Sequence, residues 1–287
     1  MAGVVVVGAG QAGAALVAKL RNDGYDNPVT LIGEEPVPPY QRPPLSKKYL
    51  LGDMALERLY LRPESYYAEA GIDLRTGLRV TGIDRAAQEV VMGEERLGYA
   101  HLVLATGSLP RRLPDAIGGD LGGVHVVRTL ADVDAMAPGF QPGAKVLIVG
   151  GGNSGVQLAR ELAPSHAVTL AVRTPRRHQP AARYLRRQFL ARGPRPEPVF
   201  EDSYEQLRGA GVRICPAVAK AGKSSVTFVD GTVTTPSSVI LATGFDPGDD
   251  WLPDSARIDP PQRAMTGIPG LFVAGIPQYG GRGSDTI

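Results

Sequence analysis

The chain has 287 residues, 43% of them hydrophobic and 21% charged, which is typical of a globular protein and excludes wholesale disorder. Lys and Arg total 31 against 29 Asp and Glu, a balance that does not favour binding to nucleic acid. The lone Cys215 excludes a disulfide framework, the four His lack metal-ligand spacing, and no apolar run reaches about 20 residues. The N-terminus lacks the basic region of a secretory signal. We therefore expect a soluble, cytoplasmic α/β protein with no metal site and no membrane partner.

The first part of the chain predicts a strand, a glycine-rich turn, a helix and a second strand. Val4 to Val7 form a continuous β-branched run, which is typical of a parallel strand buried on both faces. The sequence GAGQAG follows at 8–13, then a helical stretch at 14–24 in which Gly24 is a plausible C-cap. The second strand, at 29–33, is followed by Glu34.

The second part of the chain repeats this plan. A strand at 146–150 leads into GGGNSG at 150–155, a helix at 156–165 and a strand at 168–172, followed by Arg173. Each part then closes with strands around a polar turn and ends in Ala-Thr-Gly, at 105–107 and at 242–244. The second part has a hairpin signal at Asp230-Gly231. Two copies in this context are strong evidence for a repeated dinucleotide-binding unit.

The glycines of each turn predict a phosphate site. The first glycine (8 or 150) permits the turn, and the second (10 or 152) lets a pyrophosphate approach the backbone. The third (13 or 155) allows helix and strand to pack closely. Free N–H groups and the positive end of the helix dipole would then hold the phosphates. A glycine-rich turn that binds nothing is the alternative.

The residue after the second strand indicates which ribose each unit accepts. Glu34 suits an unphosphorylated ribose, as in FAD or NAD, because a carboxylate accepts hydrogen bonds from a ribose diol and repels a 2′-phosphate. Arg173, Thr174 and Arg176 suit NADPH rather than NADH. The alternative for these arginines is a solvated basic loop, since eight Arg lie between 173 and 195.

These patterns predict an α/β fold of two Rossmann-like, three-layer domains, one inserted in the other. The first domain would comprise residues 1–113 and 246–287, with 271–276 as its last strand, and the second 114–245. Prolines and glycines at about 108–145 indicate a linker region without long elements, and a second irregular stretch is expected at about 174–200.

Distinctive segments in this order resemble two-dinucleotide-binding-domain flavoproteins of the pyridine nucleotide-disulfide oxidoreductase type. Residues 1–150 resemble the FAD-containing ferredoxin reductases of bacterial oxygenase systems, through PYQRPPLSKKYLLG (39–52), GLRVTGID (77–84), LATGSLPRRLP (104–114) and GVHVVRTLADVDAM (123–136). Residues 146–287 resemble the pyridine-nucleotide half of flavin-dependent monooxygenase-like proteins, through GGGNSG, ATGFDP and GIPGLFVAGIPQYGGRGSDTI.

The resemblance implies roles for particular residues. The FAD contacts would be Gly8, Gly10, Ala12, Gly13, Glu34, Arg42, Lys47, Val80, Ala105, Thr106, Gly107, Arg128 and Gly275. The NADPH contacts would be Gly150, Gly152, Asn153, Ser154, Gly155, Arg173, Thr174, Arg176, Ala242, Thr243 and Gly244. Lys47, near the flavin, and Gln157 would be the catalytic pair. Gln157 stands where the ferredoxin reductases carry a Glu, so Lys47 would lose its ion-pair partner.

The resemblance implies hydride transfer from NADPH to FAD, with electrons passed on to a ferredoxin-like protein or a small acceptor. The eight-Arg stretch could dock an acidic ferredoxin, although a solvated loop is an equal alternative. A second hypothesis is a monooxygenase-like enzyme that uses O2, although the fingerprint FxGxxxHxxxW/Y is missing. A third is a non-catalytic dinucleotide-binding protein, because we expect the chain to lack the reductases' C-terminal domain.

Overall fold

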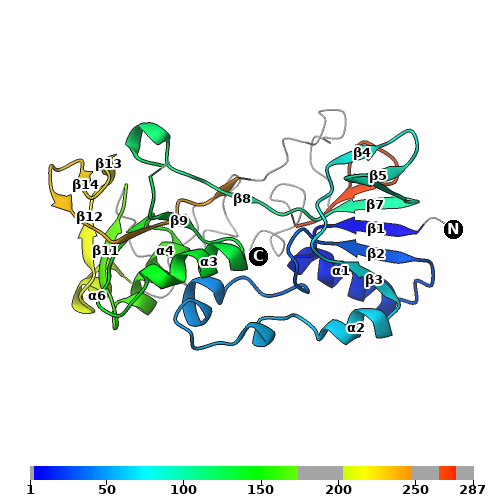
Figure 1. Cartoon of the computed structure of the whole chain (residues 1–287), viewed down its shortest axis with the longest axis horizontal. Coiled ribbons are helices and arrows are strands. Elements are labelled where there is room, and N and C mark those ends of the chain that lie inside the picture. Colours follow the sequence, from blue (N-terminus) through cyan, green and yellow to red (C-terminus); the bar gives the residue numbers. More distant parts are fainter. Residues whose placement is uncertain (1–2, 120, 174–202, 247–264, 276–287) are drawn as a thin grey trace, which may run out of the picture. The chain divides into compact units, whose positions relative to one another are not determined.

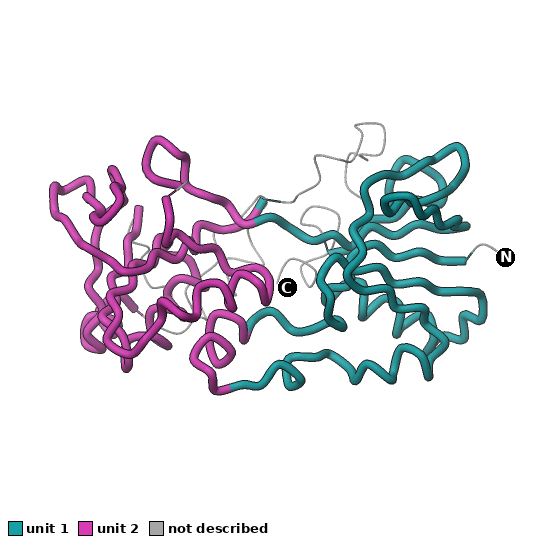
Figure 2. The backbone as a smooth tube through the Cα atoms, viewed as in Figure 1, with its two compact units in different colours: residues 1–43, 54–109, 246–287 teal, residues 44–53, 110–245 magenta. Residues whose placement is uncertain are grey.

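The computed structural model describes residues 3–119, 121–173, 203–246 and 265–275. The chain forms two compact units, drawn in two colours in Figure 2. The first unit comprises residues 1–43, 54–109 and 246–287, and the second comprises residues 44–53 and 110–245. The chain therefore passes between the units four times.

A five-stranded parallel sheet forms the centre of the first unit (Figure 1). Its strand order is β18–β7–β1–β2–β3, with β1 at Val4–Val7, β2 at Val29–Ile32, β3 at Ile72–Arg75, β7 at His101–Leu104 and β18 at Leu271–Val273. All four valines of β1 are buried, as a strand covered on both faces requires.

Two different layers cover this sheet. Helices α1 (Gln11–Asn22) and α2 (Glu64–Glu69) lie on one face, where Val17 and Tyr67 pack with Val4 and Val6. A three-stranded antiparallel sheet of β4 (Gly82–Asp84), β5 (Glu89–Met92) and β6 (Glu95–Gly98) lies on the other, where Val90 packs with Val5. The predicted three-layer α/β organisation is confirmed.

The second unit repeats the arrangement. Its parallel sheet has the order β12–β11–β10–β16–β9, with β9 at Val124–Val126, β10 at Lys145–Val149, β11 at Ala167–Ala171, β12 at Arg213–Cys215 and β16 at Ser238–Leu241. Helix α4 (Asn153–Leu162) packs against β10 and β11. The antiparallel strands β13 (Val218–Ala221), β14 (Val226–Phe228) and β15 (Val233–Thr234) contribute Val226 and Phe228 to its core.

Shorter elements complete the described chain. They are the helices α3 (Leu130–Met136) and α6 (Tyr204–Gly209), the π-helix η1 (Leu45–Tyr49), the 3-10 helices η2 (Leu56–Arg58), η3 (Asp115–Ile117) and η4 (Ala137–Gly139), and the paired strands β8 (Leu109–Pro110) and β17 (Phe245–Asp246). Within the described ranges, no helix combines the length and the apolar character needed to cross a bilayer.

The helices that follow the glycine-rich turns begin three residues earlier than predicted. Helix α1 begins at Gln11 rather than at 14, and α4 begins at Asn153 rather than at 156. The reason is that Gly10 and Gly152 are the N-caps, so the turn residues after them already have helical conformation. Gly24 follows the end of α1 with φ +81°, a conformation that glycine adopts readily.

The predicted linker at about 108–145 is not only a connection. It contributes β9, which pairs in parallel with β16 at the edge of the second sheet, and the short helix α3. Three-residue strands lie below the length that periodicity can detect, so only the long-range pairing to β16 identifies β9.

The division of the chain differs from the predicted boundaries at residues 44–53 and 110–113, which lie in the second unit. Leu113 packs against the core of the second unit, and η1 packs against α3 and α4. The irregular stretch expected at about 174–200 lies outside the described residues, apart from its surroundings at Arg173 and Ser203.

Candidate functional site

The first glycine-rich turn joins β1 to α1 at the carboxyl edge of the first sheet. Gly8 has φ +114°, and a Cβ there would lie 2.2 Å from the carbonyl oxygen of Ala105. A Cβ on Gly13 would lie 2.1 Å from the carbonyl oxygen of Gly8. Any side chain at either position would therefore collide with backbone, and the turn closes only with glycine there.

The second turn, between β10 and α4, has the same geometry. Gly150 has φ +128°, and its Cβ would lie 2.1 Å from the carbonyl oxygen of Ala242. A Cβ on Gly155 would lie 1.9 Å from the carbonyl oxygen of Gly150. The Ala-Thr-Gly segment that closes each repeat thus lies directly against the first glycine of its own turn.

The middle glycine of each turn faces open space. A Cβ on Gly10 or on Gly152 would meet no atom within 4 Å. Neither residue is followed by a side chain that caps the helix, and neither α1 nor α4 has an acidic residue in its first turn. Two helix N-termini therefore have neither a side-chain cap nor a compensating negative charge in the first turn, which is the arrangement that binds a phosphate.

Several predicted FAD contacts surround the first turn. Gly275 has φ +68° and lies so close to Ala12 that a Cβ would be 2.7 Å from the Ala12 Cβ. The amide of Ala105 donates to the carbonyl oxygen of Val7, which places Thr106 and Gly107 just beyond the end of β7. These residues, which are predicted to contact FAD, thus meet at one edge of the first sheet.

Glu34, the predicted ribose ligand, lies after β2 and is exposed. Its Oε1 accepts a hydrogen bond from Nη1 of Arg79 at 2.7 Å. Arg79 directly precedes Val80, whose side chain packs against the first core. Sequence reasoning identified Glu34 and Val80 but not Arg79, which carries no spacing signal. The ion pair is solvent-exposed, so breaking it costs little free energy.

Arg42 is held by two neighbours that the sequence did not single out. Its Nη2 donates to Oε1 of Glu35 at 2.7 Å, and its Nη1 donates to the hydroxyl of Tyr40 at 3.1 Å. The Tyr40 hydroxyl donates to the other oxygen of Glu35 at 2.5 Å. This half-buried cluster fixes the Arg42 guanidinium in the first unit.

The predicted catalytic pair is in direct contact, within the second unit. The ammonium of Lys47, in η1, donates to Oε1 of Gln157, in α4, at 3.0 Å. Arg128, which was predicted to contact FAD, also lies in the second unit, where its guanidinium is 5.8 Å from the centre of the Phe245 ring.

Part of the predicted NADPH site can be located. Asn153 and Ser154 form the first residues of α4, and the hydroxyl of Thr243 donates to the carbonyl oxygen of Arg111 at 2.5 Å, next to Gly244. Arg173 is exposed just beyond β11. Thr174 and Arg176 lie outside the described residues, as does most of the eight-Arg stretch.

Tyr204 is a neighbour of the second turn that sequence reasoning missed. Its hydroxyl donates to the carbonyl oxygen of Gly151 at 3.4 Å, and a Cβ on Gly151 would meet this hydroxyl at 2.6 Å. Tyr204 opens α6, far along the chain, and no motif connects it with residues 150–155.

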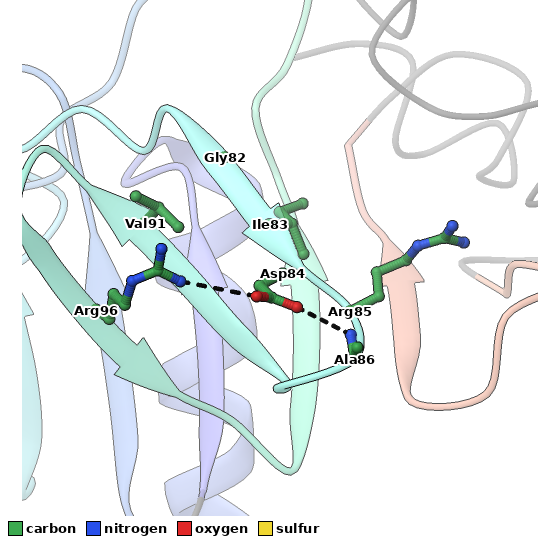
Figure 3. Close-up of a pocket in the computed structure, with 7 residues that line it drawn as sticks. All are labelled: Gly82, Ile83, Asp84, Arg85, Ala86, Val91 and Arg96. Carbon is green, nitrogen blue, oxygen red and sulfur yellow. Dashed lines mark hydrogen bonds and ion pairs between the residues drawn. The ribbon is translucent and has the colours of Figure 1, made fainter.

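Two cavities lie away from these turns. One, of about 490 Å³, lies beside β4 and β5 and is lined by Gly82, Ile83, Asp84, Arg85, Ala86, Val91 and Arg96 (Figure 3). Its carboxylate is already engaged, because Asp84 accepts from the Ala86 amide and lies 3.7 Å from Arg96. The other, of about 420 Å³, lies at the amino ends of β10, β11 and β12. Neither is lined by a residue predicted for the site.

Thiol and metal chemistry find no support in the described chain. Cys215 is buried in β12, and burial raises the pKa of its thiol, although the nearby Arg213 opposes this shift. A buried thiol with a raised pKa is a weak nucleophile. Among the residues that the structure describes, no group of His, Cys, Asp and Glu is arranged to hold a metal ion.

Comparison with known families and solved structures agrees with the expected fold of two dinucleotide-binding units. The profile of the family described as pyridine nucleotide-disulphide oxidoreductase matches residues 2–275. The solved putidaredoxin reductase–putidaredoxin complex superimposes with a TM-score of 0.78 over 96% of this chain and 67% of that chain, at 29% identity.

The similar sequences include reductases of ferredoxin-like proteins. Ferredoxin–NAD(P)(+) reductase fdr of Sphingomonas sp is 43% identical over 161 residues, which cover 56% of this chain and 39% of the relative. Putidaredoxin reductase CamA of Pseudomonas putida is 34% identical over 257 residues, 85% of this chain and 58% of the relative. The chain thus spans well under two thirds of the length of these relatives.

Proposed function

Because this chain belongs to the pyridine nucleotide-disulphide oxidoreductase family, we propose that it is an FAD-dependent NAD(P)H oxidoreductase. The observation that carries this proposal is the duplicated turn. Gly10 and Gly152 each leave open space at an uncapped helix N-terminus, one in each unit. Two phosphate sites of this kind in one chain match the need for one site per dinucleotide.

The first unit is the proposed FAD domain. The N–H groups at the start of α1 would hold the pyrophosphate, and Glu34 would exchange its bond with Arg79 for the adenosine ribose. Arg42, whose charge is shared with the carboxylate of Glu35, would contact the phosphates through its guanidinium. When bound, FAD supplies the isoalloxazine ring, which accepts a hydride and can release electrons singly.

The second unit is the proposed pyridine-nucleotide domain. The start of α4 would hold the pyrophosphate of the nucleotide, and Arg173, two residues beyond the end of β11, would contact its ribose. A guanidinium at this point favours a 2′-phosphate, so we propose NADPH as the preferred reductant. Lys47, bound to the neutral Gln157, brings a positive charge to the same unit.

For the acceptor, we propose a ferredoxin-like electron carrier. The support comes from relatives that are reductases of such carriers, among them putidaredoxin reductase CamA, whose similarity covers 85% of this chain and so continues through the second unit. A ferredoxin reductase subunit of 5,5'-dehydrodivanillate O-demethylase from Sphingobium sp. is 32% identical over 94% of the chain.

An absorbance spectrum followed by anaerobic addition of NADPH tests this proposal. We expect oxidised-flavin bands that bleach on NADPH addition, and NADPH oxidation that a ferredoxin or a dye accelerates. An oxygenated product formed with O2 would instead favour the monooxygenase-like alternative. A colourless protein that FAD fails to reconstitute would contradict the proposal and favour a non-catalytic binding protein.

The nucleotide preference has its own test. Replacing Arg173→Ala should lower kcat/KM for NADPH by about tenfold or more while changing kcat/KM for NADH about twofold at most, because only NADPH carries the phosphate that Arg173 would bind. Arg208→Ala, which removes an exposed arginine of α6, is the matched control. Equal losses with both nucleotides at position 173 would refute the assignment.

A further inference from the structure

Residues 44–53, here called the 44–53 segment, are an unusual part of the chain. Residues 43 and 54 on either side of it belong to the first unit, yet the segment itself is part of the second unit (Figure 2). Leu45 is 1% exposed and Leu50 is 8% exposed, and η1 packs against α3 and α4. Lys47 therefore belongs to the second unit because this segment packs against α3 and α4.

Two polar contacts accompany this apolar packing. The Lys47 ammonium donates to Gln157 of α4 at 3.0 Å, and the Tyr49 hydroxyl donates to Oδ1 of Asp134 of α3 at 3.0 Å. The two donors lie two residues apart in η1, whose backbone is kinked at Lys47 (φ −128°, ψ −114°). Each donor reaches a different helix, so the two bonds together define both the position and the rotation of η1.

The charges of the two contacts differ. Across the described part of the chain, Lys47 makes no ion pair, and its partner is a neutral amide. Asp134 is a carboxylate on the exposed side of α3, and a hydroxyl that donates to a carboxylate forms a charge-assisted bond. Both bonds are therefore charge-assisted, Lys47–Gln157 through the ammonium and Tyr49–Asp134 through the carboxylate, and of these two bonds Tyr49–Asp134 is the one that holds the segment to α3.

We propose that Tyr49 and Asp134 form a latch that fastens the 44–53 segment to the second unit and so positions Lys47 beside α4. Both are positioning residues, since they act on the proposed reaction only through Lys47. The structural part of this inference is independent of the proposed function, whereas its consequence for NADPH oxidation rests on that function.

Trypsin cleavage tests the latch without any cofactor. Cleavage after Lys47 and Lys48 requires the segment to leave α3 and α4, and peptide mass analysis identifies both cuts. Asp134→Ala removes the acceptor without altering the sequence around these cuts, and Ala is a good helix former at an exposed helical position. We expect cleavage at these two bonds to accelerate about fivefold or more, as the loss of a charge-assisted bond implies.

Matched variants distinguish loss of the Tyr49–Asp134 bond from a general loss of stability of the second unit. Tyr49→Phe should accelerate the same cuts, and Asp134→Asn, which keeps an acceptor oxygen, should give an intermediate rate. Glu205→Ala, an exposed acid of α6 in the same unit, should cleave like the wild type. Wild-type cleavage rates in both Asp134→Ala and Tyr49→Phe would overturn the proposal.

A second readout addresses the role of Lys47. With FAD bound, Asp134→Ala and Tyr49→Phe should slow flavin reduction at saturating NADPH by about fivefold, with the Kd of NADPH changed less than twofold, and Asp134→Asn should recover part of the rate. Unchanged reduction rates despite faster cleavage would refute the positioning of Lys47. A protein that neither binds FAD nor oxidises NADPH would refute the proposed function, while the cleavage comparison would still decide the latch.

Discussion

Gly10 and Gly13 lie three residues apart in one turn and lack a side chain for different reasons. A Cβ on Gly13 would collide with the carbonyl of Gly8 at 2.1 Å, whereas a Cβ on Gly10 would meet nothing within 4 Å. Gly13 therefore serves the packing of helix against strand, and the space over Gly10 is available to a ligand. Gly155 and Gly152 divide the two roles in the same way.

This contrast yields a paired prediction. Gly13→Ala should lower the free energy of unfolding of the first unit by about 1–3 kcal/mol, because the added methyl group forces backbone apart. Gly10→Ala should lower this free energy by less than about 1 kcal/mol, since Gly10 has φ −91° and open space and only the poorer helix capping by Ala counts, yet it should weaken FAD binding at least tenfold. Urea unfolding and FAD titration measure both. Equal stability of the two variants would contradict the division of roles.

The buried side chain of Tyr67 predicts how the stability of the protein depends on pH. Its side chain is buried, its hydroxyl finds no hydrogen-bond partner among the described residues, and burial raises its pKa to about 12, with Arg62 opposing and Tyr66 adding to the shift. Because the unfolded state releases this proton near pH 10, the folded state loses stability as the pH rises from about 10 to about 12.

Tyr67→Phe should remove this dependence. At neutral pH the variant should be as stable as the wild type or more stable by about 1 kcal/mol, since it removes an unsatisfied hydroxyl. Between pH 10 and 12 it should lose less stability than the wild type. Thermal unfolding across this range checks both statements, with Tyr25→Phe as a control. A steeper alkaline loss in Tyr67→Phe would be inconsistent with the burial argument.

At the scale of elements, the edge of each parallel sheet is completed differently. In the first unit the strand beside β7 is β18, which arrives after the whole second unit, whereas in the second unit the strand beside β16 is β9, which precedes β10. Helix α3 follows β9 directly and begins with a capping box, in which the Thr129 hydroxyl accepts from the Asp132 amide and Asp132 accepts from the Thr129 amide. This short helix also carries Asp134.

A helix of seven residues depends on its cap. Thr129→Ala should lower the free energy of unfolding by about 1 kcal/mol, because it leaves a helix N–H group without a partner. Thr129→Ser keeps the hydroxyl and should stay within a few tenths of the wild type. Urea unfolding of the purified protein gives both values. Equal losses in the two variants would show that the methyl group, rather than the hydroxyl, matters at this position.

For the whole molecule, the two glycine-rich turns, at residues 8–13 and 150–155, predict that each dinucleotide protects a different turn. Amide hydrogen exchange should slow at residues 8–14 when FAD is added and at residues 150–156 when NADP⁺ is added, because each ligand occupies the N–H groups of one helix. A ligand at one hundred times its Kd should add about 2.7 kcal/mol of stability. Protection of both turns by FAD alone would contradict the assignment of one dinucleotide to each unit.

The sequence by itself determined the repeat, because its signals are local. Buried valines, glycines at fixed spacing and the Ala-Thr-Gly endings all follow from backbone geometry within a few residues, and the structure has the predicted strands β1, β2, β10 and β11 close to the expected positions. The starts of α1 and α4 were predicted three residues too late, because the last three residues of each glycine-rich motif already belong to the helix.

Only the tertiary structure decided the contacts that join distant parts of the chain. The attachment of residues 44–53 to α3 and α4, the pairing of β9 with β16, the bond from Tyr204 to Gly151 and the pair of Arg79 with Glu34 all depend on packing between segments far apart in sequence. Such contacts leave no periodicity in the chain, because each is made by one or two side chains whose partner is chosen by the fold.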